Sequence, residues 1–254
     1  MTEEIRGRAT KYAVVTGANK GIGFAICRQL ASQGVVVVLT ARNEKRGVEA
    51  LEKLKGLHNQ EEGGIKKSIA GIERIVTDYE LTKQCLETNF YGAKRMIEAF
   101  IPLLQLSNSP RIVSVASFLG KLKGNEIITL LCNEWAIGML SDAKSLTEER
   151  VDEVLNEFLK DFREKSIEAK GWPTYFSAYK VSKASLIAYT RVLATKYPNF
   201  RINCVCPGFC KTDVNCNTGS LTAEEGAESL VKLALLPNDG PSGLFFYRKE
   251  VTSF

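Results

Sequence analysis

The chain has 254 residues, of which 44% are hydrophobic and 25% are charged, and its formal net charge is +5. A chain of this size can bury one large core, so we expect a single domain over residues 1–254. The basic residues are spread along the chain, whereas a dedicated nucleic-acid binder clusters them, so no nucleic-acid partner is expected. The longest apolar run, Val35–Leu39, is far too short to span a bilayer.

The cysteines and the N-terminus indicate the compartment. Residues 1–4 include two acids and no apolar signal region, so we expect a cytoplasmic protein. Seven cysteines, an odd number without an export signal, are typical of reduced thiols. Four of them cluster without a Cys-x-x-Cys pair or a nearby histidine, so small packing residues explain them better than a zinc site, and no metal is expected. These four are Cys204, Cys206, Cys210 and Cys216.

A glycine-rich turn, T-G-A-N-K-G-I-G over residues 16–23, follows the apolar run Tyr12–Val15. A helical apolar pattern then runs from Ile22 to Leu30 and stops at Gly34. A buried strand, a glycine turn and a helix N-terminus form an anion site, because backbone N–H groups and the positive helix end point at a phosphate. The glycine spacing alone also suits a simple tight turn, but its flanking strand and helix favour dinucleotide binding.

Residues 35–40, V-V-V-V-L-T, are predicted to form a second buried strand of a parallel sheet. In a dinucleotide fold the residue just after this strand meets the adenosine ribose, where an acid selects NAD and an arginine accommodates the 2′-phosphate of NADP. Arg42 occupies that place, and Lys20 in the glycine turn adds a second positive charge. Each could be a solvated surface base, but together they favour NADP(H). An amphipathic helix is predicted over 44–57.

Residues 58–78 are unusually short for this class of fold. A helix is predicted from about Tyr79 to Leu104, so only this stretch separates it from the preceding helix. A doubly wound sheet normally places a strand, a helix and a strand here, which needs roughly thirty residues or more. The stretch is polar, interrupted by glycines and holds at most one short strand. We therefore predict that one or two sheet strands are missing or replaced.

The remaining elements continue an α/β pattern. The strand Arg111–Ser117 ends in small polar residues, at the end of the strand where ligands bind in such sheets. Residues 121–172 form a long insertion with a helical apolar stripe after the N-cap Thr147, which we expect to cover the substrate cleft. Further predicted elements are a helix over 177–197, a strand over Arg201–Cys206 that ends at Pro207-Gly208, a helix from the capping box Thr222-x-x-Glu225 to Leu236, and a strand over 244–247.

Tyr179 and Lys183 are four residues apart in a predicted helix and therefore lie on one face. An ammonium beside a phenol favours the phenolate, so we expect the pKa of Tyr179 to fall towards the neutral range, where it can exchange a proton with a carbonyl or alcohol oxygen. A hydroxyl such as that of Ser117 could hold the substrate oxygen. A second Tyr-x-x-x-Lys copy, Tyr79 and Lys83, lacks the flanking strands and is assigned a surface role.

Together these motifs resemble the short-chain dehydrogenase/reductase family, a doubly wound α/β (Rossmann) fold with flanking helices. The resemblance rests on T-G-A-N-K-G-I-G, the serine of S-V-A-S, Y-K-V-S-K and C-P-G-F-C-K-T, and covers nearly the whole chain. The insertion before Tyr179 resembles the plant branch of menthone, neomenthol and salutaridine reductases, which implies a monomer. The implied activity is NADPH-dependent reduction of a small hydrophobic ketone, either monoterpenoid-like or alkaloid-like.

The resemblance also implies roles for individual residues. Tyr179 corresponds to the general acid/base, Ser117 to the holder of the substrate oxygen, and Lys183 to the residue that binds the ribose and lowers the phenol pKa. Asn89, in L-E-T-N-F-Y-G, corresponds to the helix asparagine that supports a proton-relay water, although it could be an ordinary helix-surface amide. The implied cofactor-binding residues are Gly17, Asn19, Lys20, Gly21, Ile22, Gly23, Arg42, Asn89, Tyr179, Lys183, Pro207, Gly208 and Thr212.

One departure from the family pattern leaves a second hypothesis open. The family's Asn-Asn-Ala-Gly motif and the aspartate that contacts adenine are both absent, and both would belong in residues 58–78. Losing a central strand leaves unpaired backbone groups in a sheet. The alternative to an active reductase is therefore a shortened, catalytically impaired or non-catalytic form of such an enzyme.

Overall fold

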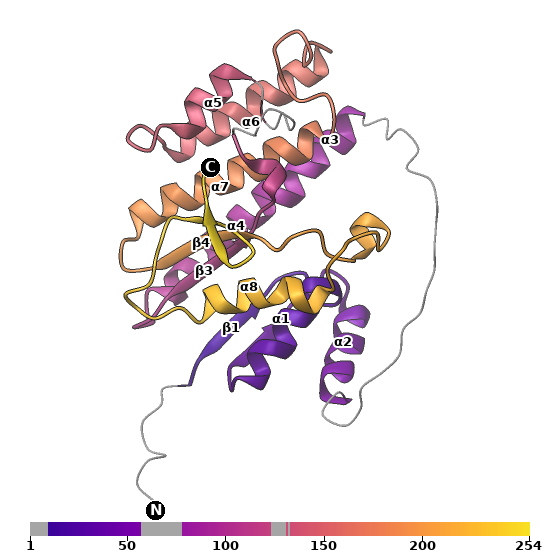
Figure 1. Cartoon of the computed structure of the whole chain (residues 1–254), viewed down its shortest axis with the longest axis vertical. Helices are drawn as coiled ribbons and strands as arrows, with labels where there is room; N and C mark the ends of the chain where they lie inside the picture. Colours follow the sequence, from indigo (N-terminus) through magenta and orange to yellow (C-terminus); the bar gives the residue numbers. More distant parts are fainter. Residues whose placement is uncertain (1–9, 57–77, 123–130, 132) are drawn as a thin grey trace, which may run out of the picture. The chain divides into compact units, whose positions relative to one another are not determined.

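A computed structural model of the chain describes residues 10–56, 78–122, 131 and 133–254. The chain divides into two compact units (Figure 1). The first unit consists of Met1–Gly71 and Phe209–Val231, and the second of Ile72–Gly208 and Lys232–Phe254. The short strand considered for residues 58–78 lies outside the described residues except for Asp78, and the single domain over 1–254 stays a prediction.

The first unit begins with a strand, a helix, a parallel strand and a helix, which is the predicted order. The two strands pair in parallel with Tyr12 opposite Val36, as a helical crossover allows. Helix α1 packs against both strands, and Gln29 of α1 donates to the backbone carbonyl of Glu224 at 3.0 Å. The elements are β1 (Tyr12–Val15), α1 (Gly21–Ser32), β2 (Val36–Leu39), α2 (Glu44–Gly56) and the later η3 (Asp213–Asn215) and α8 (Ala223–Ala234), whose last residues belong to the second unit.

The prediction that both of these strands are buried is wrong for one face of the sheet. Tyr12, Val14, Val36 and Val38 are between 40% and 74% exposed. Tyr12 pairs with Val36 and Val14 with Val38, so the four side chains share one face. A run of four valines is typical of a strand that is covered on both faces. Side chains alternate between the two faces along each strand, so helix α1 covers only every second side chain and the others are exposed.

The second unit contains the larger sheet, in the order β3-β4-β5-β6, with the first three strands parallel and β6 antiparallel. The sequence predicts a strand at the position of β5 but does not predict β6, which pairs with β5 in a hairpin. The elements are α3 (Tyr79–Leu86), the π-helical turn η1 (Glu87–Tyr91), α4 (Gly92–Leu104), β3 (Arg111–Val115), the 3₁₀ turn η2 (Phe118–Gly120), α5 (Glu134–Ser141), α6 (Glu148–Arg163), α7 (Ser177–Lys196), β4 (Arg201–Cys206), β5 (Phe245–Tyr247) and β6 (Glu250–Thr252).

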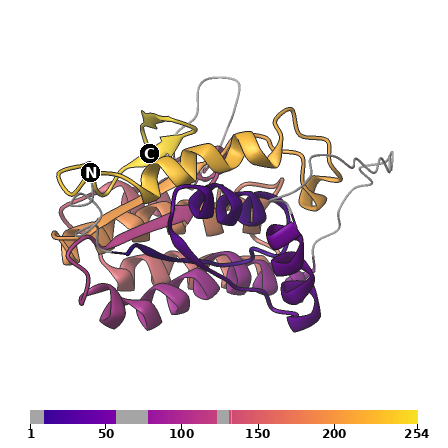
Figure 2. The same ribbon diagram turned by 90° about the horizontal axis from the view of Figure 1, so that it is seen from below.

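Helix α7 lies at the centre of the second unit. It packs against β4 on one side and against α3 and α6 elsewhere, while α4 packs against β3 (Figures 1 and 2). Small residues such as Ala184 and Ala188 are fully buried in it, which lets neighbouring elements approach closely. Within the described ranges, no helix is both long and apolar enough to cross a membrane.

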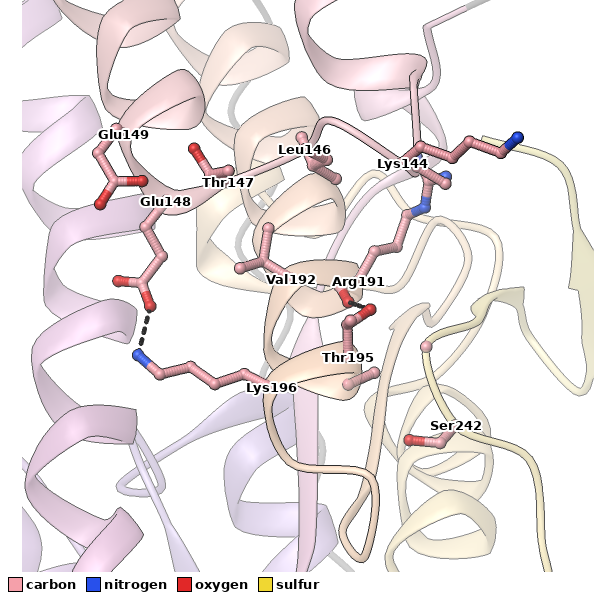
Figure 3. Close-up of a pocket in the computed structure, with 13 residues that line it drawn as sticks. Lys144, Leu146, Thr147, Glu148, Glu149, Arg191, Val192, Thr195, Lys196 and Ser242 are labelled. Carbon is pink, nitrogen blue, oxygen red and sulfur yellow. Dashed lines mark hydrogen bonds and ion pairs between the residues drawn. The ribbon is translucent and has the colours of Figure 1, made fainter.

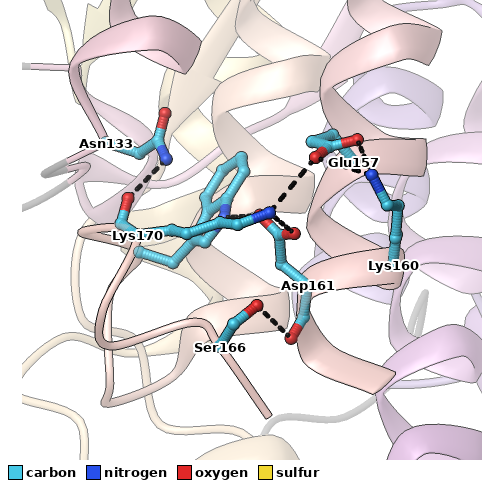
Figure 4. Close-up of polar contacts among 7 residues, drawn as sticks. Asn133, Glu157, Lys160, Asp161, Ser166 and Lys170 are labelled. Carbon is cyan, nitrogen blue, oxygen red and sulfur yellow. Dashed lines mark hydrogen bonds and ion pairs between the residues drawn. The ribbon is translucent and has the colours of Figure 1, made fainter. Parts of the chain in front are cut away.

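The predicted insertion is helical, and a buried carboxylate fixes its end (Figure 4). Asp161 of α6 is 1% exposed and accepts hydrogen bonds from Trp172 Nε1 at 2.8 Å and from Lys170 Nζ. Asn133 Nδ2 in turn donates to the Lys170 carbonyl at 2.7 Å. The segment between α6 and α7 is therefore held by charge-assisted bonds rather than by regular secondary structure.

We expect Asp161→Ala to lower the free energy of unfolding by about 3 kcal/mol, because the buried indole N–H loses its acceptor. Urea denaturation measures this loss. Glu157→Ala is the matched control, since Glu157 meets Lys170 only at 3.5 Å on the surface, and it should cost less than about 0.5 kcal/mol. Equal losses in the two variants would contradict this account.

Candidate active site

Tyr179 and Lys183 lie on successive turns near the start of α7, as the four-residue spacing predicts. Lys183 Nζ donates a hydrogen bond of 2.8 Å to the backbone carbonyl of Val115, the last residue of β3. The same nitrogen lies 5.7 Å from the centroid of the Tyr179 ring. Burial lowers the pKa of Lys183 to about 8. The contact with Val115 ties the helix to the carboxyl end of the strand.

Ser117 lies two residues beyond β3 and contacts the phenol. Its hydroxyl donates a hydrogen bond to the Tyr179 oxygen, which opposes the larger effect of burial on the pKa of that phenol. Burial dominates, so the pKa of Tyr179 is raised rather than lowered. The expected lowering by Lys183 is therefore wrong for the structure described here, because desolvation disfavours the phenolate more strongly. Tyr179 is consequently held as a neutral phenol.

Asn89 lies in a π-helical turn within what the sequence predicts as one continuous helix. The amide N–H of Gly92 donates to the carbonyl of Glu87, five residues back. Asn89 Nδ2 donates to Ser182 Oγ of α7 at 3.2 Å, so the side chain faces the helix of Tyr179 and is not a surface amide. Single π-helical turns inside α-helices are frequent at functional sites.

Gly120 is a residue of this site that the sequence interpretation missed. A Cβ atom at this position would lie 2.6 Å from the backbone carbon of Lys183 and 2.8 Å from the amide nitrogen of Ala184. Only glycine allows η2, which follows Ser117, to approach α7 this closely. A glycine in a loop gives no sequence signal until its neighbour in space is known.

The second Tyr-x-x-x-Lys copy has a different environment, as predicted. Tyr79 begins α3, and its hydroxyl accepts a hydrogen bond from Arg163 at 2.5 Å. The guanidinium of Arg163 also lies over the Tyr79 ring, 4.5 Å from its centroid. This contact is a surface cation–π pair between α3 and α6.

The glycine turn of the first unit has the conformation that its sequence requires. Gly17 and Gly21 have φ values of +61° and +57°. A Cβ on Gly23 would lie 2.7 Å from the carbonyl oxygen of Gly17, so the start of α1 packs directly on the turn. Asn19 and Lys20 lie within the turn, and Ile22 begins α1 together with Gly21. This backbone fits the close approach of a phosphate to a helix N-terminus.

A cavity of about 300 Å³ in the first unit adjoins this turn, and three basic and two acidic side chains line it. Lys20 and Arg46 line it together with Lys53 of α2, and Lys20 forms an ion pair with Asp213. Arg42, which the sequence favours as the 2′-phosphate contact, is exposed and does not line this cavity. Arg46 lines the cavity but was not singled out from the sequence, because a base on an amphipathic helix resembles an ordinary solvated side chain.

The remaining predicted cofactor residues fall in both units. In the first, a Cβ on Gly21 would lie 3.6 Å from Thr212 Cγ2, so Thr212 is adjacent to the glycine turn. In the second, Pro207 and Gly208 follow β4 directly, and Gly208 has a φ of +93°. Asn89, Ser117, Tyr179 and Lys183 also belong to the second unit.

The cysteine cluster does not form a metal centre among the described residues. Cys204 and Cys206 are in β4 of the second unit, whereas Cys210 and Cys216 belong to the first. Within the part of the chain that the structure describes, no three His, Cys, Asp or Glu side chains are grouped to hold a metal. The burial of Cys204, Cys206 and Cys210 agrees with packing residues.

A larger cavity of about 590 Å³ in the second unit contains none of the predicted catalytic residues (Figure 3). Lys196 of α7 and Glu148 of α6 form an ion pair of 2.9 Å at its wall. Charged side chains with partners of their own line much of it, so we do not assign the chemistry to this cavity.

Comparison with known proteins identifies relatives over nearly the full chain. A family profile described as short chain dehydrogenase matches residues 11–76, and one described as enoyl-(acyl carrier protein) reductase matches residues 165–240. The (+)-neomenthol dehydrogenase of Capsicum annuum is 60% identical over 317 aligned residues, covering 97% of this chain and 98% of that protein.

Two solved structures agree with these matches. Salutaridine reductase from Papaver somniferum has a TM-score of 0.81 at 43% identity and covers 93% of this chain and 99% of its own. Menthone neomenthol reductase from Mentha piperita has a TM-score of 0.79 at 41% identity and covers 96% of this chain and 100% of its own. This likeness confirms the predicted doubly wound α/β fold with flanking helices.

The same alignments agree with the predicted shortening. The alignment with the Capsicum annuum protein spans 317 positions, whereas this chain has 254 residues. More than sixty aligned positions therefore have no residue here, although both ends of the relative are nearly reached.

We expect Gly120→Ala to lower the free energy of unfolding by about 2 kcal/mol, because the new methyl group would overlap backbone atoms of α7 that cannot rotate away. Thermal or urea unfolding measures this. Gly138→Ala in α5 is the control, since a Cβ there meets no atom within 4 Å, and it should stabilise the helix by up to about 1 kcal/mol. If Gly120→Ala is as stable as the control, the close contact is not obligatory.

Proposed function

Because this chain belongs to the short-chain dehydrogenase/reductase family, oxidoreductases that act on CH–OH and C=O groups with NAD(P)H, we propose that it is an NADPH-dependent carbonyl reductase. The observation that carries the proposal is the contact of two hydroxyls, those of Ser117 and Tyr179, beside the Lys183 ammonium. The names of its relatives, a neomenthol dehydrogenase and a salutaridine reductase, support a small hydrophobic ketone of monoterpenoid or alkaloid type as the substrate.

The proposed chemistry assigns one task to each side chain. Ser117 donates a hydrogen bond to the carbonyl oxygen of the substrate and orients it. Tyr179, which burial keeps as a neutral phenol, gives its proton to that oxygen as the oxygen becomes an alkoxide. Lys183 supplies positive charge next to the phenol and stabilises the phenolate that remains. When bound, the nicotinamide cofactor supplies the hydride.

The proposed cofactor is NADPH, and the features of the first unit support its phosphate groups. The glycine turn and the cations Lys20, Arg42 and Arg46 favour a phosphate-rich cofactor and support NADPH over NADH. Ile22 is the second residue of α1, so its backbone N–H belongs to the helix N-terminus. The residues proposed to hold the cofactor are Gly17, Asn19, Lys20, Gly21, Ile22, Gly23, Arg42, Arg46, Asn89, Tyr179, Lys183, Pro207, Gly208 and Thr212.

Three further features belong to this proposal. We take the chain as one dinucleotide-binding domain over 1–254, with the insertion 121–172 near the substrate cleft. A monomer is supported by the packing of α5 and α6 on α7, because α6 buries Val151, Leu155 and Phe158 within the same core. The described cysteines form no disulfide, which supports a reducing, cytoplasmic compartment.

A catalytically impaired or non-catalytic form of such a reductase is the second candidate. The observation that favours it is the alignment of 317 positions against 254 residues. The aligned relative therefore has segments that this chain lacks. If one of them is a sheet strand, its loss leaves backbone donors of the neighbouring strands unpaired. Cofactor binding separates the two candidates.

Turnover tests the catalytic assignment directly. With NADPH and a panel of cyclic ketones, the wild-type chain should consume NADPH, measured as the loss of nicotinamide absorbance. Tyr179→Phe should lower kcat by roughly 100- to 10,000-fold, because the proton donor is gone while the ring remains. Tyr79→Phe, the same change in the other Tyr-x-x-x-Lys copy, should leave kcat within about twofold. Full activity of Tyr179→Phe would refute the assignment.

A titration of the melting temperature tests the cofactor. NADPH should raise the melting temperature of the chain, since a ligand that binds only the folded state stabilises it. Arg42→Ala and Arg46→Ala should each weaken NADPH binding roughly tenfold and leave NADH binding unchanged, because each removes a charge-assisted bond to the 2′-phosphate. Lys45→Ala is the control, because Lys45 neither lines the cavity, as Arg46 does, nor holds the place after β2 that the fold gives to the ribose contact, as Arg42 does. No shift at millimolar NADPH would favour the non-catalytic form.

A further inference from the structure

Ser182 lies three residues after Tyr179 and is fully buried, with an exposed fraction of 0%. Its hydroxyl donates to the backbone carbonyl of Tyr179 at 2.8 Å and accepts a hydrogen bond from Asn89 Nδ2 at 3.2 Å. The same amide nitrogen also meets Cys85 Sγ at 3.4 Å. Sulfur is a weak acceptor, so the Ser182 oxygen is the stronger of the two partners of Asn89.

We propose that Ser182 is a positioning residue for the reduction, because it links the π-helical turn that carries Asn89 to the turn of α7 that carries Tyr179. This inference rests on the proposed function. Asn89 and Tyr179 belong to different helices, so packing alone allows each to shift without the other. A hydroxyl that bonds to both fixes their separation, and small displacements in an active site can lower a rate by orders of magnitude.

The contacts of this hydroxyl are with neighbouring residues of the protein. A serine has one O–H donor, which goes to the Tyr179 carbonyl, and its oxygen accepts from Asn89. Cys85 also contacts the Ser182 side chain. Because Ser182 is fully buried, we infer that it acts through these neighbours. Removing it leaves Asn89 Nδ2 with only the sulfur of Cys85, and an amide donor held in this way can rotate away.

The chain contains a matched control in the next turn of the same helix. Ser185 is also 0% exposed, but its hydroxyl has no hydrogen-bond partner among the described residues. Ser182→Ala and Ser185→Ala therefore remove the same atom from the same kind of environment. They differ in whether that atom is bonded to Asn89.

Steady-state kinetics on the full chain should separate the two variants. We expect Ser182→Ala to lower kcat about tenfold while the KM for NADPH changes by less than about twofold, and Ser185→Ala to match the wild type in both. If Ser182→Ala does not fold, Ser182→Thr and Ser182→Val replace it, since they have the same shape and only threonine keeps the hydroxyl. Threonine should then retain more activity than valine. Equal kcat within either pair would overturn the inference.

A double-mutant cycle tests whether Ser182 acts through Asn89. In an Asn89→Ala background, Ser182→Ala should cause little further loss of kcat. If the two residues acted independently, the fold-losses in kcat of the two single variants would multiply in the double variant. The melting temperatures of the same four proteins should also be non-additive, with a loss of about 3 °C from Ser182→Ala that largely disappears when Asn89 is absent. Additive changes in both measurements would overturn the inference. An inactive wild-type chain with non-additive melting temperatures would instead refute the proposed function alone.

Discussion

The hydrogen bond from Lys183 to the carbonyl of Val115 joins the two elements of the second unit that carry the candidate site. It joins the second turn of α7 to the last residue of β3, so it sets the distance between the residues that follow the strand and those that begin the helix. Ser117 follows the strand, and Tyr179 lies in the first turn of the helix. The Lys183 ammonium therefore contacts both the Tyr179 ring and the Val115 carbonyl. The hydrogen bond to that carbonyl offsets part of the free-energy cost of burying the charge.

Desolvation has opposite effects on the two ionisable groups of this site. It raises the pKa of the phenol and lowers the pKa of the ammonium, so it favours the neutral form of each. A neutral phenol that already accepts a hydrogen bond from Ser117 is suited to donating a proton to a carbonyl oxygen. In the proposed reaction, the positive charge of Lys183 would matter most once the phenolate has formed. Burial thus gives this site a neutral phenol beside a lysine whose pKa is lowered to about 8.

Local patterns predicted the regular elements well, because apolar periodicity and caps act over a few residues. Tyr12–Val15 and Arg201–Cys206 are observed with the predicted bounds, and Thr222 and Glu225 form the predicted capping box. What depends on neighbours in space could not be predicted. The π-helical turn has no sequence periodicity that distinguishes it from an α-helix. Gly120 is required only because the backbone of Lys183 lies next to it. Desolvation of the buried phenol reverses the expected shift in the Tyr179 pKa. Arg46 looks like any base on a helix surface.

The π-helical turn at Glu87–Tyr91 also limits how this chain can change. Such a turn contains one residue more than an α-helical turn closed by the i→i+4 bond. Deleting one residue from this turn would restore an ordinary α-helical turn and leave the apolar faces of α3 and α4 nearly in register, because one wide turn is exchanged for one narrower turn. Deleting a residue from the regular helix on either side would instead rotate everything beyond it by about 100° and turn an apolar face away from the core. A loss of one residue is therefore far better tolerated in the turn of Asn89 than in the helices that flank it.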